Sequence, residues 1–524
     1  MPQANPPSAE ITGDEMSGNG RFSTELANTQ FFADCSAMNK IPSHVARRQA
    51  EICLALVQEI DQAVVNSRQP ADQVLAGLYR QHRDYGARDR RFFSNAVFSW
   101  FRWRGWLKTP TNENIAAAIL LDAPEIPPPI EYMIQPSKLC QRQLETLRPC
   151  PGFAIGSAEA SSGQAVAGLA EAQASPKAPP RRAGPGSTPP ATILEFLDIN
   201  LTPSNLKPLG PLNLDDKAAS LRELLKGDRR RIEQLAPDWV SDFLFIPSDC
   251  NPEAHLRQCL ESFQTRPPTW LRLRSDQILR LINLLTQMKI ETGTHPFIKQ
   301  AVFIKGPKNC DLSQLPGAEA QDLASQCVGI CCNPKPGEQW WDVCAGSGGK
   351  SFHLADLMTG KGSILATDTR AGILQEFRRR LERNRITGIT VRLWDGTQAT
   401  APERQFDGVL LDAPCSGIGT WHRNPDARWR AAPDTVPSHA ALQSALLKTC
   451  AKQVRPGGRL VYAVCTVTRA ETADVIEGFL AGRQDFRLEP TAHPLSGNPT
   501  PGLIWIWPWE SECNGMFIAC LTKR

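Results

Sequence analysis

From about Gln339 to its end, the chain alternates between short apolar strands and amphipathic helices, and this alternation limits the possible folds more than any other feature. The predicted strands are WWDVCA, SILATD, ITVRLW, DGVLLDAP and RLVYAVCT, and helical runs such as ILQEFRRRLERN and HAALQSALLKTCAKQV lie between them. Such alternation predicts an α/β fold, a Rossmann-like doubly wound sheet over residues 319–524. Ligands of these sheets bind beyond the carboxyl ends of the strands, so residues there are the candidate functional residues.

The rest of the 524-residue chain is long enough for further domains. We expect a disordered polar tail over 1–40, a helical domain over 41–150 and a helical and small α/β module over 191–318. Residues 151–190 are rich in Ala, Gly, Ser and Pro and predict a low-complexity linker, because they cannot bury enough apolar surface to fold. Within the module, PTWLRLR and FIKQAVFIKG predict strands on either side of a helix in DQILRLINLLTQMK.

The segment Ala87–Leu107, ARDRRFFSNAVFSWFRWRGWL, alternates aromatic rings with arginines and has two interpretations. The rings and guanidinium groups could form an RNA-binding surface, with rings on bases and arginines on phosphates. Alternatively, the rings form a buried seam and the arginines mark its solvated edge. We favour burial for the rings, because so many exposed aromatics would make an adhesive surface.

Composition narrows the class of protein without fixing its function. Lys and Arg number 58 against 54 Asp and Glu, a net charge of +4 that permits a polyanionic partner but does not require one. Sixteen cysteines are spread along a chain that shows no secretion signal, so we expect thiols rather than a disulfide framework. The sequence contains no apolar run of about 18 residues, so we predict no membrane-spanning segment. We therefore expect a cytoplasmic protein with no membrane partner.

The first predicted strand leads into the glycine-rich turn GSGGKS, Gly346–Ser351, which indicates a ligand close to the backbone. A P-loop would need glycine where Cys344 stands, and a dinucleotide fingerprint would need glycine at Ser351. Acidic residues follow successive strands instead, namely Asp342, Asp368, Asp395 and Asp412. Acids at these positions would repel a triphosphate and suit a ligand with hydroxyls and positive charge. S-adenosylmethionine, a sulfonium with an ammonium group, meets that description.

Two cysteines follow neighbouring strands, Cys415 in DAPCSG and Cys465 in YAVCTVTRAET. An isolated cysteine is more often a small core residue than a nucleophile. Here, however, both thiols fall at the predicted ligand edge. Carbon 5 of a pyrimidine is too weak a nucleophile to accept a methyl group unaided, and a thiolate that adds to carbon 6 makes it electron-rich. The cysteine pair therefore favours covalent pyrimidine methylation.

At these residues the sequence resembles the Sun/RsmB and NSUN family of RNA cytosine-5 methyltransferases. DVCAGSGGK is similar to the family's D-x-C-A-A-P-G-G-K loop, and DAPCSG matches a second motif. YAVCTVTRAET resembles the Y-S-T-C-S-x-x-x-x-E motif, with Glu471 at the glutamate position. AQDLASQ, NPDARW and NGMFIA resemble three further motifs in order, and RDRRFFSNAVFSWFRW looks like part of the NusB-like domain of the RsmB branch.

The resemblance implies roles for named residues. Cys465 would be the nucleophile on carbon 6, Cys415 would assist release of the product, and Asp412 would hydrogen-bond the cytosine edge. The S-adenosylmethionine pocket would comprise Cys344, Ala345, Gly346, Ser347, Gly348, Gly349, Lys350, Asp368, Asp395 and Asp412. The sequence departs from the family pattern at Gly346-Ser347, at Val464 and Thr466 around the nucleophile, and at Met516. No departure removes a reacting group.

The family also implies RNA as the partner, with small-subunit ribosomal RNA as the first expectation and tRNA as the alternative, and we expect a monomer. The base must be unstacked to expose carbon 5. The runs FRRRLERNR and GDRRR could line an RNA path or be solvated helix faces. A second hypothesis is an RNA-binding or assembly factor that keeps the fold without catalysis. A third is a metalloprotein, prompted by Cys327, Cys331 and Cys332, but their spacing matches no common metal site. We therefore expect no metal.

Overall fold

A computed structural model describes residues 41–123, 126–134, 212–225, 231–273, 278–287, 290–305 and 317–524 of the chain. The predicted tail at 1–40 and linker at 151–190 lie outside these residues, as does most of the GDRRR run. Among the described helices, none has both the length and the apolar character to cross a membrane.

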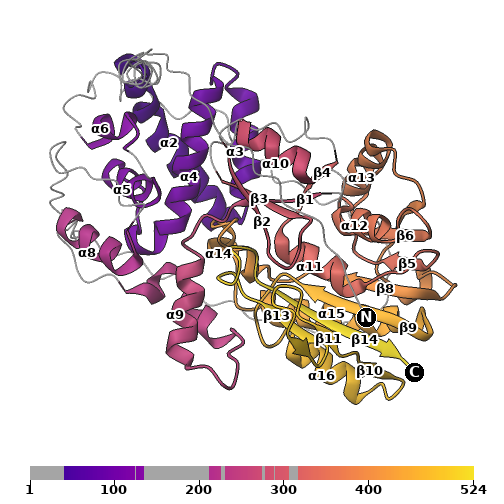
Figure 1. Cartoon of the computed structure of the whole chain (residues 1–524). Coiled ribbons are helices and arrows are strands. Elements are labelled where there is room, and N and C mark those ends of the chain that lie inside the picture. The colour runs from indigo at the N-terminus through magenta and orange to yellow at the C-terminus, as the bar shows by residue number, and fades with distance from the viewer. Residues whose placement is uncertain are drawn as a thin grey trace, which may run out of the picture.

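The N-terminal part of the chain forms a cluster of helices, drawn in indigo in Figure 1. Its elements are α2 (Ser43–Ser67), α3 (Ala71–Gln81), α4 (Ala87–Leu107), α5 (Asn112–Asp122) and α6 (Pro129–Ile134), joined by α8 (Leu214–Leu225) and the short η3 (Ile232–Leu235). One apolar core connects them, from Ala50 on α2 to Leu235 on η3. The short η4 (Asp238–Asp242) and α9 (Pro252–Ser262) follow and lead toward the rest of the chain.

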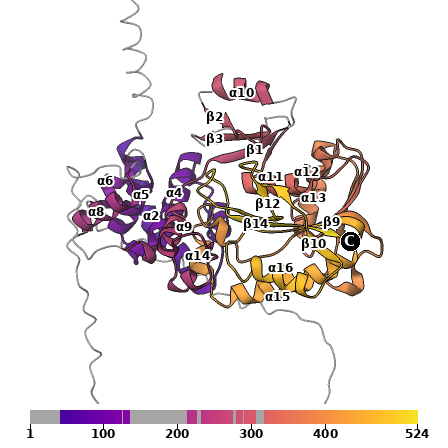
Figure 2. The ribbon, with the colours of Figure 1, turned by 60° about the horizontal axis from the view of Figure 1, so that its bottom comes forward.

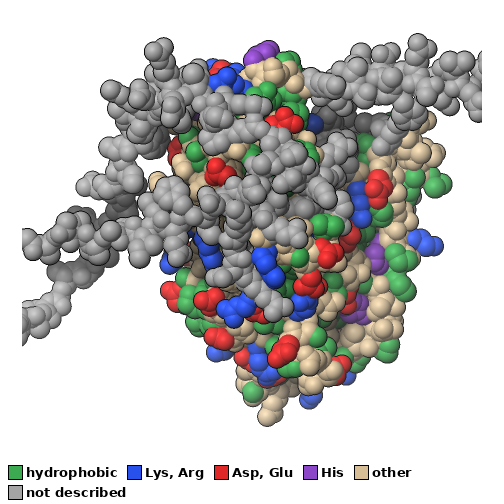
Figure 3. Space-filling model, turned by 90° about the vertical axis from the view of Figure 1, so that its left-hand side faces the viewer, with side chains coloured by type: hydrophobic (Ala, Val, Ile, Leu, Met, Phe, Trp, Pro, Cys, Tyr) green, Lys and Arg blue, Asp and Glu red, His purple; other side chains and the backbone are tan. Residues whose placement is uncertain are grey.

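Helix α4 decides between the two interpretations of the aromatic segment. Five of its rings are buried in the helical core, namely Phe93, Trp100, Phe101, Trp103 and Trp106. The packing interpretation is therefore correct for these rings. Two of the arginines are tied inward, since Arg104 pairs with Asp61 at 2.7 Å and Arg102 pairs with Asp122. On the face shown in Figure 3, the visible basic and acidic side chains are intermixed.

A small sheet with one helix lies next to the C-terminal sheet, and Figure 2 shows it above that sheet with α10 on its outer side (Figures 1 and 2). Its strands are β1 (Thr269–Leu273), β2 (Glu291–Thr294), β3 (Ala301–Lys305) and β4 (Ala318–Ala320), and its helix is α10 (Ile278–Gln287). The strands pair antiparallel in the order β2-β3-β1-β4. The predicted strand, helix and strand of this module are confirmed as β1, α10 and β3.

The C-terminal part contains the large sheet, whose path runs β10-β14-β9-β8-β5-β6-β7, with β13 paired to β14. The five strands predicted from sequence are β5 (Gln339–Asp342), β6 (Ser363–Asp368), β7 (Ile389–Leu393), β8 (Phe406–Asp412) and β9 (Val454–Val464). All five pair in parallel. The added strands β10 (Phe486–Leu488), β13 (Leu503–Ile506) and β14 (Met516–Lys523) pair antiparallel, so the whole sheet is mixed.

Helices cover both faces of this sheet, as Figure 2 shows. One face carries α11 (Leu323–Cys332), α12 (Gly349–Leu357) and α13 (Ala371–Asn384), and the other carries α15 (Thr435–Lys452) and α16 (Ala473–Ala481). Side chains of neighbouring strand residues point to opposite faces of the sheet. Trp340 packs in the core that contains α11, whereas Trp341 packs in the core that contains α15 and α16. Because both faces are buried at the centre of the sheet, a central strand such as β8 is a nearly continuous apolar run. The short elements η7 (Gln398–Thr400), η8 (Ile418–Thr420), α14 (Ala427–Arg430), β11 (Thr491–Ala492) and β12 (Pro499–Thr500) occupy the connections.

The segment that includes α14 joins the helical cluster to the large sheet. The guanidinium of the fully buried Arg428 donates to the carbonyl oxygens of Leu235 and Phe263, each at 2.8 Å. The indole of Trp429 donates to the carbonyl oxygen of Phe101 at 2.7 Å. The NPDARW motif therefore serves as a structural joint, which fixes where the helical cluster lies relative to the sheet.

Two glycines in helices test this packing. A Cβ on Gly105 of α4 would lie 1.7 Å from the carbonyl oxygen of Gln234, whereas a Cβ on Gly77 of α3 would meet only the flexible end of Arg80, at 3.9 Å. We expect Gly105→Ala to lower the free energy of unfolding by about 1–3 kcal/mol through overpacking. The matched Gly77→Ala should raise it by about 0.4–1 kcal/mol. Thermal and urea unfolding followed by circular dichroism measure both, and equal effects at the two sites would contradict the described contact.

Candidate active site

The predicted site residues meet at one edge of the large sheet because of its topology. The chain runs from β5 outward through β6 and β7, then returns to β8 on the other side of β5, so the strand order reverses between β5 and β8. Crevices at such a reversal are where ligands of open α/β sheets bind. The glycine loop follows β5, Asp412 ends β8, and Cys465 follows β9.

The two cysteine sulfurs lie side by side at this edge. The Sγ atoms of Cys415 and Cys465 are 3.3 Å apart, and both residues are half-buried. A disulfide would hold the two sulfurs about 2 Å apart, so this pair consists of two thiols in hydrogen-bonding contact. The sequence placed the two residues on neighbouring strand ends, and the structure brings their sulfurs together.

The two thiols have shifted acidities in opposite directions. A hydrogen bond from the Cys415 thiol, aided by the charge of Lys350, lowers the pKa of Cys465 although burial and Asp412 oppose the shift. The same hydrogen bond, together with burial and the charge of Glu471, raises the pKa of Cys415 well above its ordinary value. Of the two cysteines, Cys465 therefore forms a thiolate more readily. A thiolate is the nucleophilic form of cysteine.

Lys350 and Asp412 form an ion pair beside the sulfurs. The Nζ atom of Lys350 donates to Oδ2 of Asp412 at 2.6 Å and to Oγ of Ser325 at 3.3 Å. Burial disfavours the ammonium, but the charge and hydrogen bond of Asp412 outweigh it and raise the pKa of Lys350. Lys350 is therefore a fixed cation that neutralises a carboxylate and stabilises the nearby thiolate of Cys465.

A buried glutamate holds the two cysteine loops together. Glu471 is fully buried, and its carboxylate accepts hydrogen bonds from the amide and hydroxyl of Ser416, at 2.8 and 2.6 Å. It also accepts from the hydroxyls of Thr466 and Thr468 and from the amide of Gln443. Ser416 follows Cys415 and Thr466 follows Cys465, so one carboxylate determines the positions of both sulfurs.

The glycine loop between β5 and α12 is shaped for close approach. Gly348 has φ +91°, and a Cβ there would lie 2.2 Å from the ring of Phe377, so only glycine fits. The loop leads into the N-terminus of α12, and the first amides of a helix are available to bind a ligand. The loop residues Cys344, Ala345, Gly346 and Ser347 are half-buried at the sheet edge. Burial raises the pKa of Cys344 well above its ordinary value, so that thiol is no candidate nucleophile.

Asp368 ends β6 next to this loop, and its carboxylate accepts a hydrogen bond from the amide of Gly346 at 3.0 Å. Its carboxylate also accepts three hydrogen bonds from Arg370, each at 2.9 Å. Burial opposes the negative charge, but these bonds together hold the pKa of Asp368 below its ordinary value. The side chain of Arg370 is 65% exposed, so a ligand hydroxyl can replace a guanidinium bond without opening the core.

Asp395 differs from the other predicted cofactor residues. It is exposed beyond β7, and its carboxylate accepts the amide and hydroxyl of Thr397 and the hydroxyl of Thr400. These local bonds lower its pKa. The described contacts of Asp395 therefore lie in its own turn, and its role toward a cofactor stays a prediction.

Sequence reasoning missed two partners in the site. Ser325 of α11 contacts Lys350, and Gln443 of α15 contacts Glu471, although neither was proposed as a site residue. The AQDLASQ motif was the available signal for Ser325, but no local pattern marks Gln443. The cysteines at 327, 331 and 332 are buried in α11 among apolar side chains. Within the described ranges, no three or more His, Cys, Asp or Glu side chains are grouped to hold a metal ion.

Comparison with known sequences places the C-terminal residues in a family. The family described as "16S rRNA methyltransferase RsmB/F" matches residues 329–522. Residues 329–522 of the chain are thus similar to the RsmB/F family. The match begins within α11 and ends in β14, so it includes every predicted site residue.

The names of curated relatives agree with this similarity. One named "Probable ribosomal RNA small subunit methyltransferase B", from Synechocystis sp. (strain ATCC 27184 / PCC 6803 / Kazusa), is 36% identical over 302 residues, which cover 55% of the chain and 66% of the relative. A second relative, from Vibrio cholerae, is 31% identical over 303 residues, and the match covers 65% of that relative. The matched region thus spans just under two thirds of these relatives. The crystal structure of PH0851 shares the fold, with a TM-score of 0.62 at 20% identity over 92% of this chain and 99% of that one.

A buried acid beneath the glycine loop predicts that stability depends on pH. Asp342 is fully buried, and its Oδ2 atom accepts a hydrogen bond from the hydroxyl of Ser351 at 2.5 Å. Its Oδ1 atom has no hydrogen-bond partner among the described residues. Burial raises its pKa from 3.8 to about 7. Because the folded pKa exceeds the unfolded one, its contribution to stability is complete below about pH 4 and is lost as the pH rises through 7.

We therefore expect the free energy of unfolding of the wild type to fall by up to about 4 kcal/mol more than that of Asp342→Asn when the pH is raised from 4 to 8. The asparagine variant lacks this effect because its side chain carries no charge that could be buried. Urea unfolding of both proteins across this range measures the difference. A gap between the two proteins that does not change with pH would contradict the assignment.

Proposed function

We propose that this chain is an S-adenosylmethionine-dependent RNA cytosine-5 methyltransferase that acts on small-subunit ribosomal RNA. The observation that carries the proposal is the pair of sulfurs 3.3 Å apart beside the Lys350–Asp412 ion pair. Within this pair, the hydrogen bond from the Cys415 thiol favours a thiolate on Cys465. Both cysteines follow the carboxyl ends of neighbouring strands, where ligands of such sheets bind. The family named for 16S rRNA methyltransferases supports the reaction class.

The reaction begins at Cys465. Its thiolate forms a bond with carbon 6 of the cytosine, and the electron pair of the C5–C6 double bond moves toward carbon 5. Carbon 5 would then bond to the methyl group as the bond between that methyl and the donor sulfur breaks, with the electron pair left on the donor sulfur. A base, for which the Cys415 sulfur is our candidate, would take the carbon 5 proton, and the bond between the Cys465 sulfur and carbon 6 would break, which restores the double bond and releases the thiolate of Cys465.

Asp412 and Lys350 orient and stabilise the base. Asp412 ends β8 next to the sulfurs. Its carboxylate can therefore accept a hydrogen bond from the cytosine amino group or share a proton with ring nitrogen 3. Lys350 keeps Asp412 and the thiolate of Cys465 close together, because its ammonium compensates both negative charges. The two side chains thus preorganise charge where the bond to carbon 6 forms.

The loop from Cys344 to Lys350 and the carboxylate of Asp368 fit S-adenosylmethionine. Gly348 leaves room for close backbone approach, and Asp368 can accept ribose hydroxyls after exchange with Arg370. The carboxylate of Asp395 is a further candidate for binding S-adenosylmethionine. When bound, S-adenosylmethionine supplies an electrophilic methyl group.

Two substitutions separate the proposed roles of the sulfurs. Cys465→Ala should abolish methylation, because no bond to carbon 6 can form. Cys415→Ala should slow release and leave protein covalently bound to RNA. Incorporation of labelled methyl into RNA and denaturing electrophoresis of protein–RNA adducts measure the two effects.

RNA that contains 5-azacytosine provides the control, since it should trap wild type and Cys415→Ala but not Cys465→Ala. A protein that binds RNA without catalysis would form no adduct with any variant. Full turnover by both cysteine variants would exclude the mechanism.

The substrate is tested separately from the chemistry. The curated relatives are named for small-subunit ribosomal RNA, and tRNA is the alternative. Bisulfite sequencing of total RNA from a strain that lacks this chain should show loss of a methylated cytosine in small-subunit ribosomal RNA. Loss confined to tRNA would replace the proposed substrate, and restoration by wild type but not by Cys465→Ala assigns the change to catalysis.

A further inference from the structure

The fold keeps the two sulfurs of the candidate site together without any ligand. Their strands β8 and β9 are parallel neighbours, and the chain stays paired beyond the strand ends. The amide of Ala413 donates to the carbonyl oxygen of Ala463 at 2.9 Å. The amide of Gly419 donates to the carbonyl oxygen of Cys465 at 3.2 Å. The loop that carries Cys415 is therefore held against the residue that carries the second sulfur.

The distance between the sulfurs is short enough for a covalent bond to form after a small movement. The two Sγ atoms are 3.3 Å apart, and a disulfide would bring them to about 2 Å. Rotation of one cysteine side chain covers this difference, so the carboxylate of Glu471 can keep its bonds to both loops. Both cysteines are only partly buried, so small molecules can reach the pair.

One thiol of the pair is also the favoured point of attack for an oxidant, because oxidants react with the thiolate form of cysteine. The hydrogen bond from the Cys415 thiol lowers the pKa of Cys465. Burial, by contrast, raises the pKa of Cys53 and Cys259 to about 12 and that of Cys344 well above its ordinary value. An oxidised Cys465 would have the sulfur of Cys415 directly beside it.

We propose that Cys415 and Cys465 form a site of reversible oxidation, at which a hydroperoxide converts the two thiols into a disulfide. This pairing needs neither RNA nor S-adenosylmethionine and does not rest on the proposed function. Its consequence for methylation does rest on that function, because the sulfur of Cys465 could not add to carbon 6 while bonded to Cys415. Oxidation would therefore stop methylation, and reduction of the disulfide would restore it.

The conversion takes two steps. The thiolate of Cys465 attacks one oxygen of hydrogen peroxide, the O–O bond breaks, and the products are a sulfenic acid and a hydroxide ion, which takes up a proton. The sulfur of Cys415 then attacks the sulfur of the sulfenic acid and loses its proton, and the hydroxyl group leaves as water. The two sulfurs together lose two electrons, which reduce the peroxide to water.

The surroundings of Cys415 favour the second step over further oxidation. Its sulfur contacts that of Cys465, so it meets the sulfenic acid before a second peroxide molecule does. The hydrogen bond to Cys465, burial and the charge of Cys465 raise the pKa of Cys415 well above its ordinary value. A sulfenic acid is uncharged, so the last of these contributions would disappear when it forms.

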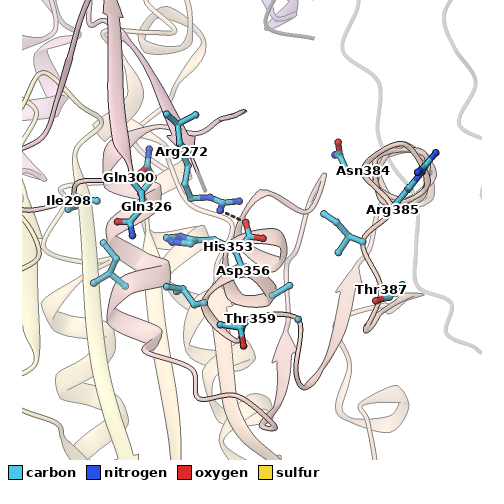
Figure 4. A pocket seen from close by; sticks show the side chains of 16 residues that line it. Arg272, Ile298, Gln300, Gln326, His353, Asp356, Thr359, Asn384, Arg385 and Thr387 are labelled. Carbon is cyan, nitrogen blue, oxygen red and sulfur yellow. Dashed lines mark hydrogen bonds and ion pairs between the residues drawn. The ribbon is translucent and has the colours of Figure 1, made fainter. Parts of the chain in front are cut away.

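The cavity shown in Figure 4 takes no part in this chemistry. No cysteine is among the described residues that line it. Its wall includes three polar atoms without a described hydrogen-bond partner, Nη2 of Arg272, Nδ1 of His353 and Oε1 of Gln326, but all three are buried. We therefore expect oxidation at the edge of the large sheet and not in this cavity.

The test treats the full chain with hydrogen peroxide, blocks the remaining thiols with iodoacetamide, and digests the protein with trypsin in the absence of a reducing agent. Trypsin cleaves after arginine and lysine and yields residues 405–423 and 460–469, in which Cys415 and Cys465 are the respective single cysteines. In wild type the two peptides should be joined, with a mass two hydrogen atoms below their sum. Dithiothreitol should separate them.

Two variants distinguish a reactive pair from a single reactive thiol. Cys415→Ser should give no joined peptide, and its Cys465 should gain two oxygen atoms and become a sulfinic acid, which dithiothreitol does not reverse. Cys250→Ser is the matched control, because Cys250 is exposed in the turn before α9 and lies outside the site. This control should give as much joined peptide as wild type.

Wild type that gives no joined peptide at a peroxide concentration that oxidises Cys250 would overturn the proposal, as would Cys465 joined mainly to another cysteine. Under the proposed function, oxidised wild type should also lose about tenfold or more of its RNA methylation rate and regain it with dithiothreitol. The peptide analysis needs no methyl transfer. Joined peptides from a chain that methylates no RNA would support the disulfide and overturn only the proposed function.

Discussion

The active site depends on one buried carboxylate. Glu471 is removed from water, and a charge in such a place is costly unless several donors surround it. Its donors come from the residues that follow the two cysteines and from Gln443 on α15. Neither cysteine loop can move without unpairing this carboxylate, so the separation of the two sulfurs is a consequence of folding rather than of ligand binding.

Much of this arrangement could be predicted from the sequence, because it follows from rules that act along one strand at a time. The strands β5 to β9 are apolar runs bounded by polar residues, and a parallel sheet brings their carboxyl ends to one edge. That rule alone placed Cys415 and Cys465 near one another. The bounds of α4 also match the predicted segment Ala87–Leu107. The family of the C-terminal residues was likewise indicated by the motifs.

What could not be predicted comes from contacts between segments distant in sequence. Asp368 and Asp395 both follow strands, yet Asp368 lies against the glycine loop whereas Asp395 bonds only within its own turn in the described structure. Nothing in the local pattern distinguishes the two. The antiparallel pairing of β14 with β9 and the unpaired atoms of Arg272, His353 and Gln326 are likewise products of tertiary packing.

The two sulfurs have unequal surroundings, which under the proposed function would allow two similar groups to take different roles. Lys350 lies on the side of Cys465 and favours its thiolate, while Glu471 lies on the side of Cys415 and favours its thiol. Much of the raised pKa of Cys415 comes from its hydrogen bond to Cys465. Under the proposed function, the sulfur of Cys465 would be uncharged once it is bonded to carbon 6, and that contribution would disappear. The pKa of Cys415 would then fall, and its thiolate could accept a proton at the stage when the product is released.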